Sequence, residues 1–80
     1  MNDINLNDSY ILFMPQNATI TQDNINYIIE TIKQNSAGYM YLWNDDCLVI
    51  RRDFINRYNI STDISIHGLV RLSETILLYL

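Results

Sequence analysis

The chain has 80 residues, 49% of them hydrophobic, and its nine acidic and five basic side chains give a net charge of −4. This length supports one hydrophobic core and excludes two, so residues 1–80 are expected to form a single domain, with residues 1–8 as a lead-in free to be flexible. The single cysteine excludes an internal disulfide framework, and every apolar run is far below the roughly 18 residues that span a bilayer. With acids and amides where a secretory signal would carry basic residues, the chain is predicted to be cytoplasmic.

Charge is unevenly distributed along the chain. Residues 1–50 hold six acids against Lys33, whereas residues 51–80 hold four arginines against three acids. Such an asymmetry bears on binding partners and solubility, and says little about the fold.

The first two predicted elements are a strand and a helix. Tyr10 to Met14 is apolar throughout and is followed by Pro15, which predicts a buried strand that ends there. Thr21 is suited to cap a helix that runs to about Gln34. Within it Ile25, Ile28, Ile29 and Ile32 follow the helical period, so they predict an apolar stripe that faces the core.

A β-hairpin is predicted next. Tyr39 to Trp43 and Cys47 to Ile50 are aromatic or β-branched runs on either side of Asn44-Asp45-Asp46. Because side chains alternate along a strand, Tyr39, Tyr41 and Trp43 are expected on one face of the sheet, with Met40 and Leu42 on the other.

The last third of the chain gives a weaker pattern. Residues 52–58 predict a helix of about two turns. Gly68 interrupts the pattern that precedes it. Residues 69–80 fit either a second hairpin around Ser73-Glu74-Thr75 or a helix with Leu69, Leu72, Ile76 and Leu80 on one side, and we favour strands. The predicted fold class is α+β: a small, mostly antiparallel sheet with one main amphipathic helix packed on one face and a short second helix.

No pattern indicates catalysis or a bound cofactor. His67, Cys47 and the Asp45-Asp46 pair have the residue types of a nucleophilic site, but no local signature surrounds the cysteine, which is expected to be a small buried hydrophobe. Neither zinc nor calcium spacing is present, and two isolated glycines exclude a phosphate loop. A non-enzymatic protein without cofactor or metal is expected.

The arginines form the only basic cluster. Arg51, Arg52 and Arg57 near Tyr58 have the residue types that contact phosphates and stack on bases. The net negative charge argues against direct nucleic-acid binding, and ion pairs with Asp53 and Asp63 are the simpler interpretation. The reverse hypothesis, in which the acids mimic nucleic acid, requires a denser array of carboxylates than this chain carries.

Protein binding is the predicted function. Tyr and Trp are enriched at protein interfaces, so the predicted partner-binding residues are Tyr39, Tyr41 and Trp43 with the neighbouring Asp45 and Asp46. A helix covering this face, which would make the aromatics part of the core, is the alternative. Asn, Ile and Tyr are abundant, and this composition suggests a small phage-type inhibitor or regulator that binds a host protein or a nucleic-acid-processing complex in an anti-defence role. A structural subunit or homodimer is the competing interpretation.

Overall fold

The computed structural model describes residues 2–35, 38–44 and 46–79. The elements in chain order are β1 (Asn2–Asn5), β2 (Tyr10–Met14), α1 (Gln22–Asn35), β3 (Met40–Trp43), β4 (Cys47–Arg51), α2 (Arg52–Arg57) and α3 (Ile66–Leu78). The four strands form one antiparallel sheet in the order β1-β2-β4-β3, and the predicted α+β class is confirmed.

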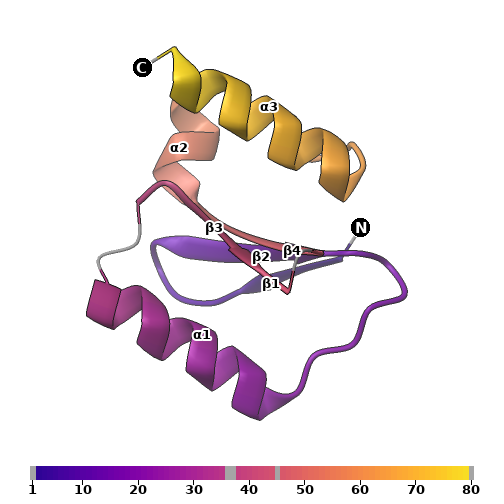
Figure 1. The fold of residues 1–80 in the computed structure, drawn as a ribbon, viewed down its shortest axis with the longest axis vertical. Coiled ribbons are helices and arrows are strands. Elements are labelled where there is room, and N and C mark those ends of the chain that lie inside the picture. The colour runs from indigo at the N-terminus through magenta and orange to yellow at the C-terminus, as the bar shows by residue number, and fades with distance from the viewer. Residues whose placement is uncertain (1, 36–37, 45, 80) are drawn as a thin grey trace.

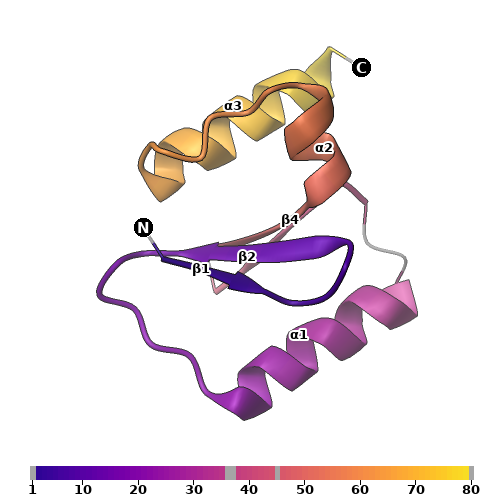
Figure 2. The same ribbon diagram turned by 180° about the vertical axis from the view of Figure 1, so that it is seen from behind.

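The sheet lies between two layers of helices. Figures 1 and 2 show α1 on one face and α2 with α3 on the other. The central strands β2 and β4 are therefore buried on both sides: Leu12 and Val49 pack in the cluster under α1, whereas Leu48 and Ile50 pack in the cluster under α2 and α3. Burial on both faces explains why these two strands are apolar throughout and do not alternate.

Helix α1 forms where the sequence predicts it. The Thr21 hydroxyl accepts a hydrogen bond from the Asn24 backbone N–H at 3.2 Å, as expected for an N-cap. Ile28 and Ile32 are buried in the cluster beneath the helix, and Ile25 packs against it. Asp23 lies in the first turn and Lys33 in the last, and each charge interacts favourably with the helix dipole at its end.

Strand β1 lies within the segment that was expected to be a polar lead-in. It pairs antiparallel with β2 in a register that places Ile4 opposite Leu12. The Asn7 side-chain oxygen accepts hydrogen bonds from the backbone N–H groups of Ser9 and Tyr10, both at 2.8 Å, and so shapes the turn between the two strands. The strand thus depends on its neighbour and its turn, because its own residues are mostly polar.

The prediction of strands for residues 69–80 is wrong, since α3 occupies residues 66–78. The Ser65 hydroxyl caps this helix by accepting from the Gly68 backbone N–H at 3.1 Å, so the glycine stands in the first turn and interrupts nothing. Ile66, Leu69 and Ser73 form the buried stripe at helical spacing. Leu78 and Tyr79 extend the apolar run, but they are more than four-fifths exposed at the helix end.

Candidate functional site

The predicted hairpin is present and carries the candidate site. β3 and β4 pair antiparallel, with Trp43 opposite Cys47 and Met40 opposite Ile50. Asn44 adopts a left-handed backbone with φ 56°, and its carbonyl accepts from the Asp46 N–H at 2.6 Å. Asp46 is exposed in this turn, whereas Asp45 lies outside the described residues.

Tyr41 and Trp43 are half-buried. Both pack against the cluster that α1 covers, so they contribute to the core on one side of β3 and remain partly accessible at the rim of the sheet. Part of each of these two side chains therefore belongs to the core, and the rest is accessible to a partner.

The prediction that Tyr39 shares a face with Tyr41 and Trp43 is wrong. Its ring packs on the opposite side of the sheet, 5.0 Å from the Phe54 ring, centroid to centroid. The chain bends at Tyr39 just before β3 begins, so the alternation of side chains along the strand does not extend to it. The three aromatics do not form one row.

Within residues 2–35, 38–44 and 46–79, no strand pairs with β3 on the side that faces away from β4. We call this side, with residues 40–43, the β3 edge; β3 is the last strand of the sheet. The Arg51 N–H donates to the Tyr39 carbonyl at 2.9 Å, which identifies Tyr39 and Arg51 as a hydrogen-bonded pair. Because hydrogen-bonded and non-hydrogen-bonded pairs alternate in an antiparallel ladder, the N–H and C=O groups of Met40 and Leu42 point outward from the sheet.

Leu42 is the exposed side chain of the β3 edge, and sequence reasoning missed it. It is 42% exposed, although its neighbour Met40 on the same face of the strand packs under α2 and α3. From sequence alone, an apolar residue in a strand is predicted to belong to the core. Leu42 is accessible because β3 lies at the end of the sheet.

The opposite edge, β1, differs in chemistry. It presents Asn2, Asp3 and Asn5 to solvent, and the Asn2 side chain donates to the Gln16 carbonyl at 2.9 Å. Charged and polar side chains on an edge strand discourage pairing with another chain. β3 contains no charged residue and no proline, so it lacks these protections.

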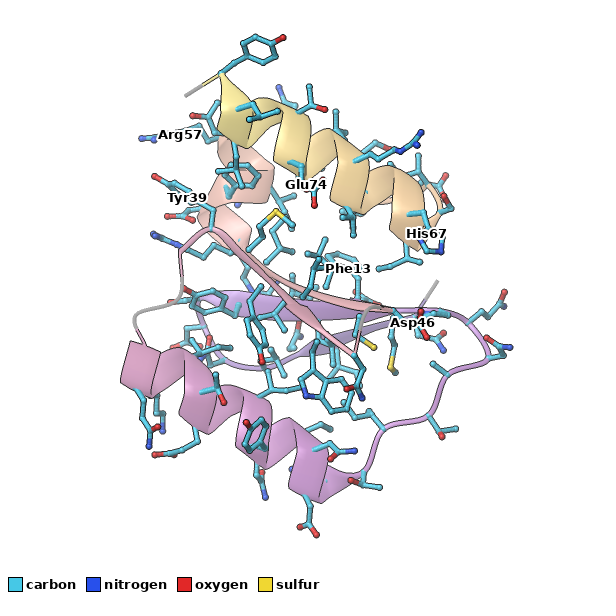
Figure 3. All side chains as sticks on the ribbon, in the orientation of Figure 1. Phe13, Tyr39, Asp46, Arg57, His67 and Glu74 are labelled. Atoms are coloured by element: carbon cyan, nitrogen blue, oxygen red, sulfur yellow. The ribbon has the colours of Figure 1, made fainter. Side chains whose placement is uncertain are left out.

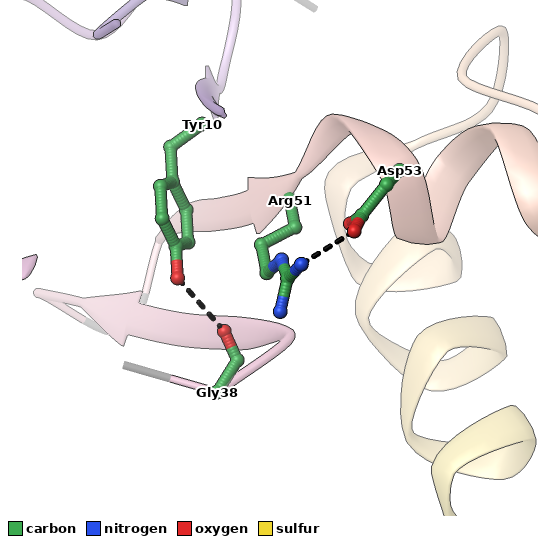
Figure 4. Close-up of polar contacts among 4 residues, drawn as sticks. All are labelled: Tyr10, Gly38, Arg51 and Asp53. Atoms are coloured by element: carbon green, nitrogen blue, oxygen red, sulfur yellow. Dashed lines mark hydrogen bonds and ion pairs between the residues drawn. The ribbon is translucent and has the colours of Figure 1, made fainter. Parts of the chain in front are cut away.

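One end of β3 is basic. The Arg51 guanidinium lies 5.2 Å from the centroid of the Tyr39 ring. The same guanidinium forms an ion pair with Asp53, as Figure 4 shows. Arg57 lines the same pocket as these three residues, and Figure 3 shows it beside Tyr39, while Asp46 lies at the far end of the strand. The predicted pairing of the arginines with Asp53 is thus confirmed for Arg51, while Arg52 donates instead to the Asn5 side chain.

The residues considered for nucleophilic chemistry are not brought together. Cys47 is buried in the cluster under α1, whereas His67 is exposed on α3, beyond the other face of the sheet. Burial raises the pKa of the Cys47 thiol, and the negative charge of Asp46 raises it further. Within residues 2–35, 38–44 and 46–79, no three His, Cys, Asp or Glu side chains are grouped so that they could hold a metal ion.

Comparison with known proteins identifies no relative of this chain. No family model, no curated protein and no solved structure matches this chain. None of the helices in the described part of the chain is long and apolar enough to cross a membrane.

Proposed function

We propose that this protein is a small, non-enzymatic protein-binding module that accepts an extended strand along its β3 edge. The observation that carries this proposal is Leu42, an apolar side chain that is 42% exposed on β3, a strand that has no neighbour on its outer side in the described part of the chain. An added strand would form main-chain hydrogen bonds with Met40 and Leu42 and place an apolar side chain beside Leu42.

The half-buried aromatics support the same site. Tyr41 and Trp43 are held by the cluster under α1, so little side-chain freedom is lost when a partner contacts their accessible parts. The proposed partner-binding surface keeps Tyr41, Trp43 and Asp46 and adds Leu42, and Tyr39 lies at its basic end. Asp45, which also belongs to the predicted surface, lies outside the described residues.

The narrower hypothesis of an inhibitor that acts on a host protein or a nucleic-acid-processing complex is compatible with this site but draws no support from it. A charge-based mimic would bind through its carboxylates, and its complex would weaken steeply with salt. Strand addition at an uncharged edge depends on backbone hydrogen bonds and apolar contact, so its complex should be much less sensitive to salt.

The test compares two leucine-to-lysine variants. Leu42→Lys puts a charge on the β3 edge, a device that natural edge strands use against pairing. Leu72→Lys is the matched control, because Leu72 is similarly exposed, at 37%, but lies on α3. The immobilised wild type and the immobilised Leu72→Lys variant should capture a partner protein that immobilised Leu42→Lys does not capture. Circular dichroism checks that all three proteins are folded.

Hydrogen exchange then locates the contact. In the complex, the outward amides of Met40 and Leu42 should become protected, whereas those of Asn2 to Asn5 on the opposite edge should not change. A complex retained equally by both lysine variants, or one that leaves the Met40 and Leu42 amides unprotected, contradicts strand addition at β3.

A further inference from the structure

The β3 edge also has the features of a surface that binds itself. We infer that its occupant is the β3 edge of a second copy of this chain, paired antiparallel about a twofold axis so that two four-stranded sheets become one of eight strands. The inference rests on the proposed function, because it takes the same edge as the binding site and names the partner.

The backbone pattern selects one register. Met40 and Leu42 carry the outward hydrogen-bonding groups, and Tyr41 stands between them. A twofold axis at Tyr41 places Met40 of each copy opposite Leu42 of the other, so that both residues of each pair exchange N–H···O=C bonds. This register satisfies the outward donors and acceptors of both residues in both copies.

The side chains agree with this register on both faces. Met40 and Leu42 lie on the face of the sheet that carries α2 and α3, so the exposed Leu42 of one copy meets Met40 of the other. On the α1 face, Tyr41 meets Tyr41 of the second copy in a non-hydrogen-bonded pair, where side chains approach most closely. Exposed apolar area is thus covered by apolar area.

Charge favours a second copy over an unrelated strand. β3 itself is uncharged, so pairing with its own copy brings no like charges face to face. Its two ends differ in sign: Asp46 lies at one, and Arg51 and Arg57 lie at the other, where Asp53 offsets only one arginine (Figure 3). The twofold axis brings the acidic end of each copy to the basic end of the other.

Self-association is tested by sedimentation. The sedimenting mass of wild type and of Leu72→Lys should rise from 9.4 kDa to twice that value as the protein concentration rises from about 1 µM to about 1 mM. This range covers the dissociation constants expected for a small interface. Leu42→Lys should remain at the monomer mass throughout. A wild type that stays monomeric, or a Leu42→Lys variant that dimerises as the wild type does, overturns the inference.

Cysteine cross-linking tests the register and does not depend on the lysine variant being folded. In a Cys47→Ala background, Tyr41→Cys faces its own copy at a Cα separation of about 4.5 Å, within the range of about 4.4–6.8 Å that a disulfide spans. With oxidised glutathione, Tyr41→Cys should form a covalent dimer. Leu42→Cys should not, because it faces Met40 of the second copy. Equal cross-linking of both variants, or of neither, contradicts the proposed pairing.

The two proposals fail in different ways. A monomeric wild type that still captures another protein through Leu42 overturns the second copy as occupant and leaves strand addition intact. A monomeric wild type whose captures are unaffected by Leu42→Lys overturns both.

Discussion

The Tyr10 hydroxyl donates a hydrogen bond to the Gly38 carbonyl oxygen at 3.2 Å, and so ties β2 to the segment that leads into β3 (Figure 4). The two residues are 28 positions apart, and the tyrosine itself is buried in the cluster under α1. This bond holds the start of the edge strand against the central part of the sheet.

Tyr10→Phe should therefore loosen the beginning of β3. Loss of one partly buried hydrogen bond should lower the free energy of unfolding by about 1 kcal/mol, measured by urea denaturation. Tyr27→Phe is the control, because Tyr27 is 62% exposed on α1, and it should have no measurable effect. Equal effects of the two variants would show that the Gly38 contact contributes nothing.

The same serine-to-alanine change should have opposite effects at the N-cap and in the buried middle of helix α3. Ser73 is fully buried on α3, and its Oγ has no hydrogen-bond partner in the described structure, so Ser73→Ala removes an unsatisfied polar group and should stabilise the fold by about 1 kcal/mol. Ser65→Ala removes the N-cap of the same helix and should destabilise by about 1 kcal/mol. Thermal unfolding of the two variants measures both effects. Destabilisation by Ser73→Ala would mean that its hydroxyl has a partner after all.

The elements predicted correctly are those whose signals are local. α1 has a cap, a helical stripe and charges of the right sign at each end, all within its own residues. β2 and the β3–β4 hairpin are apolar runs bounded by Pro15 and by the Asn44 turn. In each case the neighbouring residues carry enough signal to predict the element, although the strands still need their partners in the sheet.

The missed features depend on tertiary context. β1 is polar and becomes a strand because β2 lies beside it and Asn7 forms the turn. The sequence of residues 69–80 fits strands as well as a helix, and the helix is fixed by its packing over the sheet and by the Ser65 cap. For the candidate site, the hairpin was predictable, but the exposure of Leu42 follows from the strand order, which no local pattern encodes.

Asn59 should be sensitive to alanine but not to glycine. It follows α2 with a left-handed backbone, φ 49°, and the Ile60 N–H closes the helix end by donating to the Ile55 carbonyl at 3.0 Å. Asn59→Gly should change the free energy of unfolding by only a few tenths of a kcal/mol, whereas Asn59→Ala should lower it by about 1 kcal/mol.

The control is Asn56→Ala, the same substitution at an exposed position within α2, where alanine is the better helix former. Urea denaturation should show it to be neutral or slightly stabilising. A loss at Asn56 as large as that at Asn59 would show that the side chains, and not the left-handed backbone, cause the effect.

Cys47 should make the fold less stable at alkaline pH. Burial, with a smaller contribution from the charge of Asp46, raises the pKa of the thiol in the folded protein above its ordinary value of 9.0. The unfolded chain therefore releases this proton at lower pH than the folded one. The resulting stabilisation is complete below pH 9.0 and is lost as pH rises from there toward the folded pKa. The quantity to measure is the difference between wild type and Cys47→Ala in urea denaturation from neutral to alkaline pH. The wild type should lose stability more steeply, and Asp46→Asn should reduce that excess because it removes the smaller of the two causes. Parallel pH profiles for wild type and Cys47→Ala would show that the thiol titrates alike in the folded and unfolded chains and is not held in the core.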